Sequence, residues 1–226
     1  MASRSTWGRS TSILGCRSQS LDNERYAKLT ERLRAAGFGP DTNDNGNITR
    51  QRWKIDGPPK VTLDFLIPPS TDSDQAGQLR DIENDFAAII APGLRLAFLD
   101  CVKVTLDGLT IRAEHARRKV RVCGAGAFVI MKALAFHIRG ENKDAYDLGY
   151  VLRNFGEGPA TVAARLKPFA KAPEVLEARR YLMDDFESAR HVGPLRAAEF
   201  LYGKPNDAAQ ADTWGAVRDL LDGLPE

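Results

Sequence analysis

The sequence lacks two features that would place the protein outside a reducing compartment or in a membrane. Its 226 residues include three cysteines (Cys16, Cys101, Cys123), too few and too scattered for a disulfide framework or a zinc site. We therefore expect buried thiols in a reducing cytosol. No apolar run approaches the roughly 18 residues that a membrane-spanning helix needs. These absences predict a soluble, cytoplasmic protein with no membrane partner.

Acidic residues are absent from the first twenty positions, which contain Arg4, Arg9 and Arg17. The remaining 206 residues are almost neutral, with 29 basic and 30 acidic side chains. An acid-free stretch rich in serine and arginine has some resemblance to an organellar transit peptide, but it lacks the apolar core of a secretory signal. The alternative, which we favour, is a disordered or poorly formed arm over residues 1–20.

Several common catalytic and binding motifs are also missing. The sequence has no glycine-rich phosphate loop ending in Lys-Ser or Lys-Thr and no Gly-x-Ser-x-Gly elbow. The three histidines, His115, His137 and His191, have no metal-binding spacing. The chain does have 43% hydrophobic and 27% charged residues, which is typical of a globular protein with a sizeable core.

The first half of the chain reads as strands after one helix. Apolar spacing predicts a helix from Leu21 to about Gly37, and a polar loop rich in Asp and Asn follows over Pro40–Asn47. The turn residues Asp56–Pro59 predict a hairpin between Ile48–Ile55 and Lys60–Pro68. In the second strand, Asp64 lies on the face opposite the apolar stripe. A carboxylate fixed there is a good magnesium ligand, although an exposed sheet face is the commoner situation.

Loops and shorter strands follow this hairpin. We expect an acidic loop after Pro69, an apolar segment at Phe86–Ile90, and a second hairpin turning at Asp107-Gly108. A basic stretch then leads into a short strand at Val120–Cys123. This stretch is either a solvated hairpin edge or the best electrostatic footprint for RNA in the chain. Its cations are Arg112, Arg117, Arg118, Lys119 and Arg121.

From Ala125 onward the pattern changes to helices. We expect one helix ending near Arg139, a second from about Asn142 to Phe155, and three more over Ala160–Phe169, Pro173–Arg190 and Ala208–Leu221. Strands followed by helices predict an α+β fold with a helical C-terminal half. The expected division is an α/β core over residues 21–123 and a helical domain over 124–226.

Lys132 is the most informative single residue. It lies alone in an apolar helix, and Arg139, two turns later, falls on the same side. A desolvated lysine costs several kcal/mol unless an anion pairs with it. The next helix carries Asp144 and Asp147, which can reach that face if the two helices pack antiparallel. A snorkelling lysine or a plain interhelical salt bridge remains the structural alternative.

Two segments together resemble the AbiEii-type nucleotidyltransferase toxins, which include the minimal nucleotidyltransferase toxins of mycobacteria. Phe128–Arg139 is similar to that family's helix with a lysine followed by Ala-Leu and an arginine. Lys143–Leu148 is similar to its basic-Asp-x-x-Asp-Leu motif. Upstream, Glu24–Phe38 and Val61–Leu66 resemble the helix and the carboxylate strand of the same core. The similarity spans residues 21 to about 160.

The resemblance implies a nucleotidyltransferase-like mixed sheet and transfer of a nucleoside monophosphate from an NTP, with magnesium. In the mycobacterial branch the acceptor is the 3′ end of tRNA, and a cognate antitoxin silences the toxin. Lys132 and Arg139 would bind the nucleotide. Asp147 or Asp144 would position the phosphate or assist the acceptor, and Asp64 would be a metal ligand.

The sequence departs from this family pattern before the first helix. The family has a Gly-Gly or Gly-Ser turn and then a strand with an Asp-x-Asp motif that supplies the main metal carboxylates. Residues 7–16 contain no acid. We therefore expect either a truncated or frame-disturbed chain with impaired catalysis, or a functional protein that starts differently. The alternatives are a non-catalytic module that binds nucleotide, RNA or antitoxin, and an α+β protein whose Lys132–Asp147 pair is structural.

Overall fold

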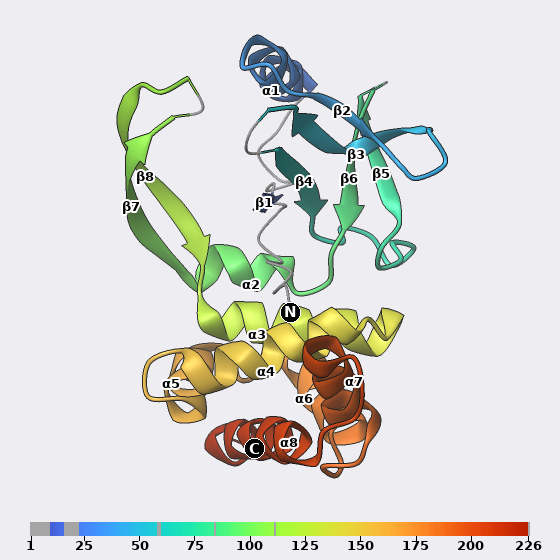
Figure 1. Cartoon of the computed structure of the whole chain (residues 1–226), viewed down its shortest axis with the longest axis vertical. Helices are drawn as coiled ribbons and strands as arrows, with labels where there is room; N and C mark the ends of the chain where they lie inside the picture. The colour runs from blue at the N-terminus through green and yellow to red at the C-terminus, as the bar shows by residue number, and fades with distance from the viewer. Residues whose placement is uncertain (1–9, 16–22, 58–59, 84, 111, 226) are drawn as a thin grey trace, which may run out of the picture. The chain divides into compact units, whose positions relative to one another are not determined.

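The computed structural model describes residues 10–15, 23–57, 60–83, 85–110 and 112–225. Strands fill most of the first half and helices the second, so the predicted α+β organisation is confirmed (Figure 1). The chain divides into two compact units, Met1–Leu94 and Arg95–Glu226. The change of pattern in the sequence predicts a boundary near residues 120–125. The division lies earlier because the second hairpin groups with the helices rather than with the first sheet.

The first unit is built around a six-stranded sheet with strand β4 at its centre. The predicted hairpin is confirmed, since β3 and β4 pair antiparallel. The other edge of β4 is shared, because β1 runs parallel to most of the strand and β6 pairs with its last two residues. The strands are β1 (Ser10–Gly15), β2 (Gly39–Thr42), β3 (Ile48–Ile55), β4 (Val61–Ile67), β5 (Leu79–Glu83) and β6 (Phe86–Ile90).

Three of these strands lie where the sequence analysis expected a loop or an arm. β2 and β5 are polar outer strands, and hydrogen bonds to β3 and β6 rather than apolar alternation define them. β1 comes from the segment expected to be a disordered arm, and its register places Ile13 opposite Asp64. The other residues of that arm lie outside the described part of the chain.

An aromatic cluster fills the core of the first unit. Phe65 and Phe86 meet edge to face with ring centroids 4.7 Å apart, and Trp53 meets Phe86 in the same way at 6.2 Å. All three rings are fully buried. Helix α1 (Asn23–Ala35) adds Leu33 to this cluster, in agreement with the predicted amphipathic helix. These contacts make β4 a rigid support for the side chains that it carries.

The second unit begins with a short helix, α2 (Leu94–Leu99), and a long two-stranded hairpin, β7 (Cys101–Leu109) and β8 (His115–Cys123). The predicted turn at Asp107-Gly108 is wrong, because β7 continues through both residues. The chain turns instead at residues 110–114, where Thr110 Oγ1 accepts a hydrogen bond from the backbone N–H of Glu114. The basic stretch therefore forms most of a strand.

A helical bundle makes up the rest of the second unit (Figure 1). The predicted helices are confirmed in order, and α7 is an additional one that the sequence analysis did not expect. Among the described residues, no helix combines the length and apolarity needed to cross a membrane. The helices are α3 (Ala125–Arg139), α4 (Asn142–Asn154), α5 (Pro159–Leu166), α6 (Pro173–Asp185), α7 (Val192–Tyr202) and α8 (Asp207–Gly223).

Candidate functional site

Helices α3 and α4 form a tight antiparallel pair that brings the predicted lysine and aspartates together. Only Gly140 and Glu141 connect them. Gly140 adopts a left-handed conformation (φ 65°), and its N–H donates to the carbonyl of Phe136 at 2.7 Å, which ends α3. Such a cap is favourable for glycine because no Cβ clashes there. The reversal places the first turns of α4 beside the last turns of α3 (Figure 1).

Lys132 is held near the surface of an otherwise buried stretch of α3. Val129, Ala133 and Phe136 on the same helix are buried, and the Lys132 side chain is 16% exposed. Its ammonium lies 5.5 Å from the centre of the Phe128 ring, one turn earlier, in a cation–π contact. The side chain of Lys132 is therefore mostly buried but still reaches solvent.

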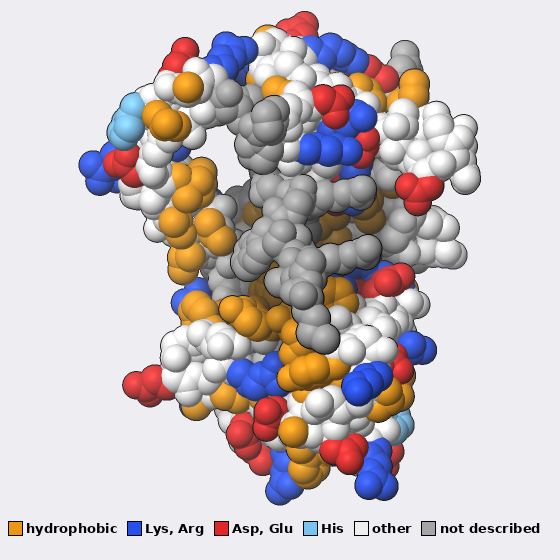
Figure 2. Space-filling model, in the orientation of Figure 1, with side chains coloured by type: hydrophobic (Ala, Val, Ile, Leu, Met, Phe, Trp, Pro, Cys, Tyr) orange, Lys and Arg blue, Asp and Glu red, His pale blue; other side chains and the backbone are white. Residues whose placement is uncertain are grey.

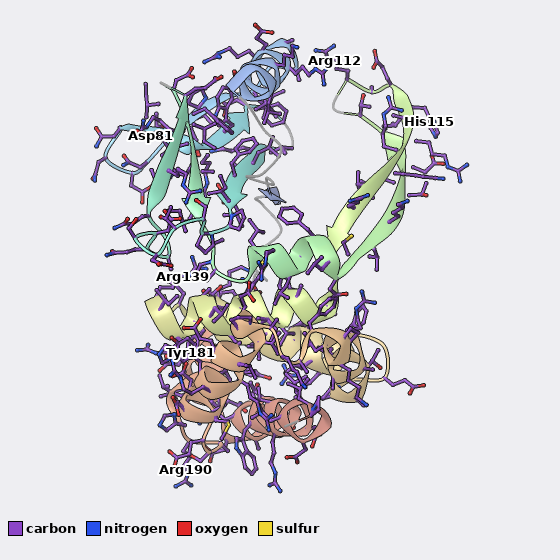
Figure 3. All side chains as sticks on the ribbon, turned by 180° about the vertical axis from the view of Figure 1, so that it is seen from behind. Asp81, Arg112, His115, Arg139, Tyr181 and Arg190 are labelled. Carbon is purple, nitrogen blue, oxygen red and sulfur yellow. The ribbon has the colours of Figure 1, made fainter. Side chains whose placement is uncertain are left out.

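Asp144 is the centre of an ion-pair cluster. Its side chain is 1% exposed, and one carboxylate oxygen accepts a hydrogen bond from Lys132 Nζ at 2.8 Å. Arg139 grips both oxygens, with Nε 2.6 Å from Oδ2 and Nη2 2.9 Å from Oδ1. Figure 3 labels Arg139 near the end of α3. The expectation that the acid pair reaches the Lys132–Arg139 face is met by this geometry.

Asp147, one turn after Asp144, lies at the outer side of the cluster. Its Oδ2 is 2.6 Å from Lys132 Nζ and 2.6 Å from Nζ of Lys143. Lys143 is mostly exposed, and it sits four residues before Asp147 on the same helix face. The cluster thus contains three cations (Lys132, Arg139, Lys143) and two carboxylates.

These contacts shift the pKa values of Asp144 and Arg139. Burial opposes ionisation of Asp144, but hydrogen bonds from Arg139 and Lys132 outweigh it and lower the pKa of the carboxyl below its usual range. The hydrogen bond to Asp144 is the main reason that the pKa of Arg139 is raised. Exposed Glu141 also contributes to that rise. Near neutral pH, Asp144 is therefore anionic and Arg139 cationic.

The cluster leaves cationic donors available for an anion. An ammonium has three N–H groups; Lys132 donates one to Asp144, and Asp147 lies at ion-pair distance from the same nitrogen. A guanidinium has five, and Asp144 takes two of those on Arg139, whose side chain is 58% exposed. Asp144 thus orients two cations whose remaining donors match a phosphate group.

Asp64 lies in the first unit and has a different environment. It is 8% exposed, because β4 is covered on both faces, so the alternative of an exposed sheet face is wrong. Arg52 on β3 is its cross-strand partner, with Nε 2.5 Å from Oδ1 and Nη2 2.7 Å from Oδ2. The pair raises the pKa of Arg52. Both oxygens of Asp64 therefore already bind a cation.

The described residues do not fit the magnesium site that the family resemblance implies. A pair of magnesium ions needs several oxygen ligands, and Asp64 offers one carboxylate that Arg52 already engages. The neighbouring strand β1 contains no acid at the positions beside Asp64. Across the described residues, no three His, Cys, Asp or Glu side chains gather to hold a metal.

The basic residues predicted to bind RNA separate on the β7–β8 hairpin. Arg117, Lys119 and Arg121 lie on one face, Arg118 lies on the other, and Arg112 is in the turn. Figure 3 labels Arg112 and His115 at this end of the hairpin. The wrong turn position had hidden this separation, because the alternation of faces follows from the strand register.

Three charged residues near these sites did not enter the predicted site, although the sequence held a signal for each. Lys143 is detectable from its i,i+4 spacing to Asp147. The contact of Arg52 with Asp64 is predictable from the first hairpin, because a turn centred on position 58 pairs residue 52 with residue 64. The position of Lys103 beside the basic residues of β8 is predictable only from the correct register of β7 against β8, which pairs it with Arg121.

Comparison of the chain with models of protein families, with curated protein sequences and with solved structures gives no match in any of the three.

Proposed function

We propose that this chain is a nucleotidyltransferase-like protein of a toxin–antitoxin system, which binds the triphosphate of an NTP at the Lys132 cluster and modifies the 3′ end of tRNA. One observation carries the proposal. Two cations of α3, Lys132 and Arg139, share the buried carboxylate of Asp144 and keep spare donors. The two segments that form this cluster are also the two that resemble the AbiEii-type toxins.

In this proposal each residue of the cluster has a distinct role. Lys132 acts as a point charge on the triphosphate, and Arg139 offers its planar fork to a second phosphate oxygen. Asp144 is a positioning residue that holds both cations. Asp147 steadies Lys132 from the outer side, where the acceptor approaches. The cognate antitoxin would act by covering or altering this cluster.

The transfer itself is a displacement at the α-phosphorus of the NTP. A bond forms between the tRNA 3′-hydroxyl oxygen and the α-phosphorus, and the bond from that phosphorus to the bridging oxygen of the β-phosphate breaks. Pyrophosphate leaves with the electron pair, and the hydroxyl proton is released to water. Positioning and charge neutralisation provide most of the catalysis in such reactions.

The second candidate is a non-catalytic module that still binds nucleotide, RNA or antitoxin but does not transfer the nucleotide. The bidentate Arg52–Asp64 pair favours it, because an arginine there neutralises the carboxylate that a metal would otherwise need. The absence of acids from β1 beside Asp64 points the same way. Both candidates share the Lys132 cluster as the nucleotide site.

A transfer assay separates the two candidates. Purified protein is incubated with each radiolabelled NTP, total tRNA and magnesium. The transferase predicts label in tRNA that is lost in Lys132→Ala and retained in the matched control Lys204→Ala, which removes an exposed lysine elsewhere in the same unit. No incorporation with any NTP contradicts the transferase. NTP binding that still depends on Lys132 then establishes the second candidate.

A further inference from the structure

The β7–β8 hairpin is a ribbon with two chemically different faces. Side chains alternate between the faces along each strand, and directly paired residues share a face. One face carries Val102, Val104 and Leu106 paired with Val122, Val120 and Arg118. Figure 2 shows apolar side chains gathered along this hairpin, in agreement with the exposure of Val102, Leu106 and Val122. We call the other side of the hairpin the basic face.

The basic face presents a ladder of cations. Its successive rungs pair Lys103 with Arg121, Thr105 with Lys119, and Asp107 with Arg117. The four cations are exposed. Asp107 is paired within the ribbon, with His115 at 3.0 Å and Arg117 at 3.7 Å. In the part of the chain that the structure describes, Lys103, Lys119 and Arg121 have no acid within ion-pair distance.

This charge is concentrated in the ribbon. Residues 101–123 contain six Lys or Arg and two Asp or Glu, a net charge of +4, whereas the remaining chain has 26 cations and 28 acids, a net charge of −2. The rung of Lys103 and Arg121 places like charges directly opposite each other, which destabilises a strand pair. An anion bound along the face would relieve that repulsion.

We propose that the basic face of the β7–β8 ribbon binds the sugar–phosphate backbone of tRNA. Rungs on one face recur about every 7 Å along the strands, so Lys103, Lys119 and Arg121 form a linear array suited to a polyanion rather than to one small anion. Cations on such an array gain affinity by releasing counterions from the nucleic acid. The choice of tRNA rests on the proposed function, whereas the backbone contact rests on the ribbon alone.

The test compares variants on the two faces of the same ribbon. Fluorescence anisotropy measures binding of labelled tRNA between 50 and 200 mM salt, concentrations at which such contacts respond strongly. We expect the triple variant K103A/K119A/R121A to lose about tenfold or more in affinity and to make the salt slope shallower by about 2 to 3. Arg118→Ala is the matched control, because it removes a cation from the neighbouring position on the opposite face.

A stability measurement separates binding from a structural role. Because the triple variant removes the like-charge pair, its thermal unfolding midpoint is expected to be unchanged or raised while tRNA affinity falls. Equal losses in Arg118→Ala and the triple variant, or unchanged affinity in the triple variant, would overturn the proposal. The triple variant should still bind NTP through Lys132, so loss of tRNA binding alone does not count against the nucleotide site.

Discussion

Two buried aspartates, one in each unit, are gripped by an arginine through both oxygens, but their surroundings differ. Asp64 has one cation, Arg52, whose side chain is 46% exposed, on a rigid central strand. Asp144 has two cations and a second carboxylate one turn away, on a pair of helices. In the first arrangement Arg52 occupies both oxygens of Asp64. In the second, Lys132 and Arg139 keep N–H donors that Asp144 does not use. The second arrangement therefore has donors left for the phosphate of the proposed function.

The largest effect is expected on the free energy of unfolding when each of the two carboxylates, Asp144 and Asp64, is replaced with an amide. Replacing Asp144 with Asn leaves Lys132 inside the unit with a weaker partner, and removing one side of a buried pair costs about 3 kcal/mol. Replacing Asp64 with Asn is expected to cost about 1 kcal/mol, because Arg52 can turn toward water. Denaturant unfolding followed by circular dichroism measures both values. Equal costs in the two variants would remove the distinction drawn between the sites.

A pH profile sharpens the same comparison. The pKa of Asp144 is lowered in the folded protein, so the unfolded chain takes up its proton first as the pH falls. Its stabilising contribution is therefore full above the unfolded value of about 3.9 and is lost as the pH falls through the lower folded value. Unfolding free energies of the wild type and Asp144→Asn should converge below about pH 4. A gap that stays constant into strong acid would contradict this assignment.

The smallest effect is expected at the outer side of the cluster. Lys143 is mostly exposed, and its i,i+4 pair with Asp147 is of a kind that contributes about 0.3 to 0.5 kcal/mol. Lys143→Ala should therefore change the unfolding free energy by no more than about 0.5 kcal/mol, as measured by the same denaturant titration. A loss as large as that of Asp144→Asn would contradict the ranking of this exposed pair below the buried carboxylate.

The sequence predicted those parts of the fold that have strong local patterns. The alternation and turn of the first hairpin located β3 and β4, and helical spacing with a glycine stop located α3 and α4. The Lys132–Asp144 proximity followed, because a two-residue connection leaves only an antiparallel pair. Local pattern decided these elements, and tertiary contacts agree with it.

Other parts depend on contacts that no local pattern records. The outer strands β2 and β5 are polar and owe their conformation to their neighbours. The Asp107-Gly108 pair has turn propensity, yet the register of β7 against β8 runs through it. Strand β1, which pairs with β4 beside Asp64, comes from a segment with no apolar alternation. Tertiary pairing overrides propensity at all of these positions.

The central claim is that the Lys132 cluster is the nucleotide-binding site, and NTP binding tests it most directly. Isothermal titration with each NTP is compared between the wild type, Lys132→Met and the control Lys204→Ala, whose folding is checked by thermal unfolding. We predict that at least one NTP binds the wild type and Lys204→Ala equally and binds Lys132→Met at least tenfold more weakly, since a charge-assisted contact to phosphate is lost. Equal affinity in the folded Lys132→Met variant, or no NTP binding by the wild type, would contradict the claim.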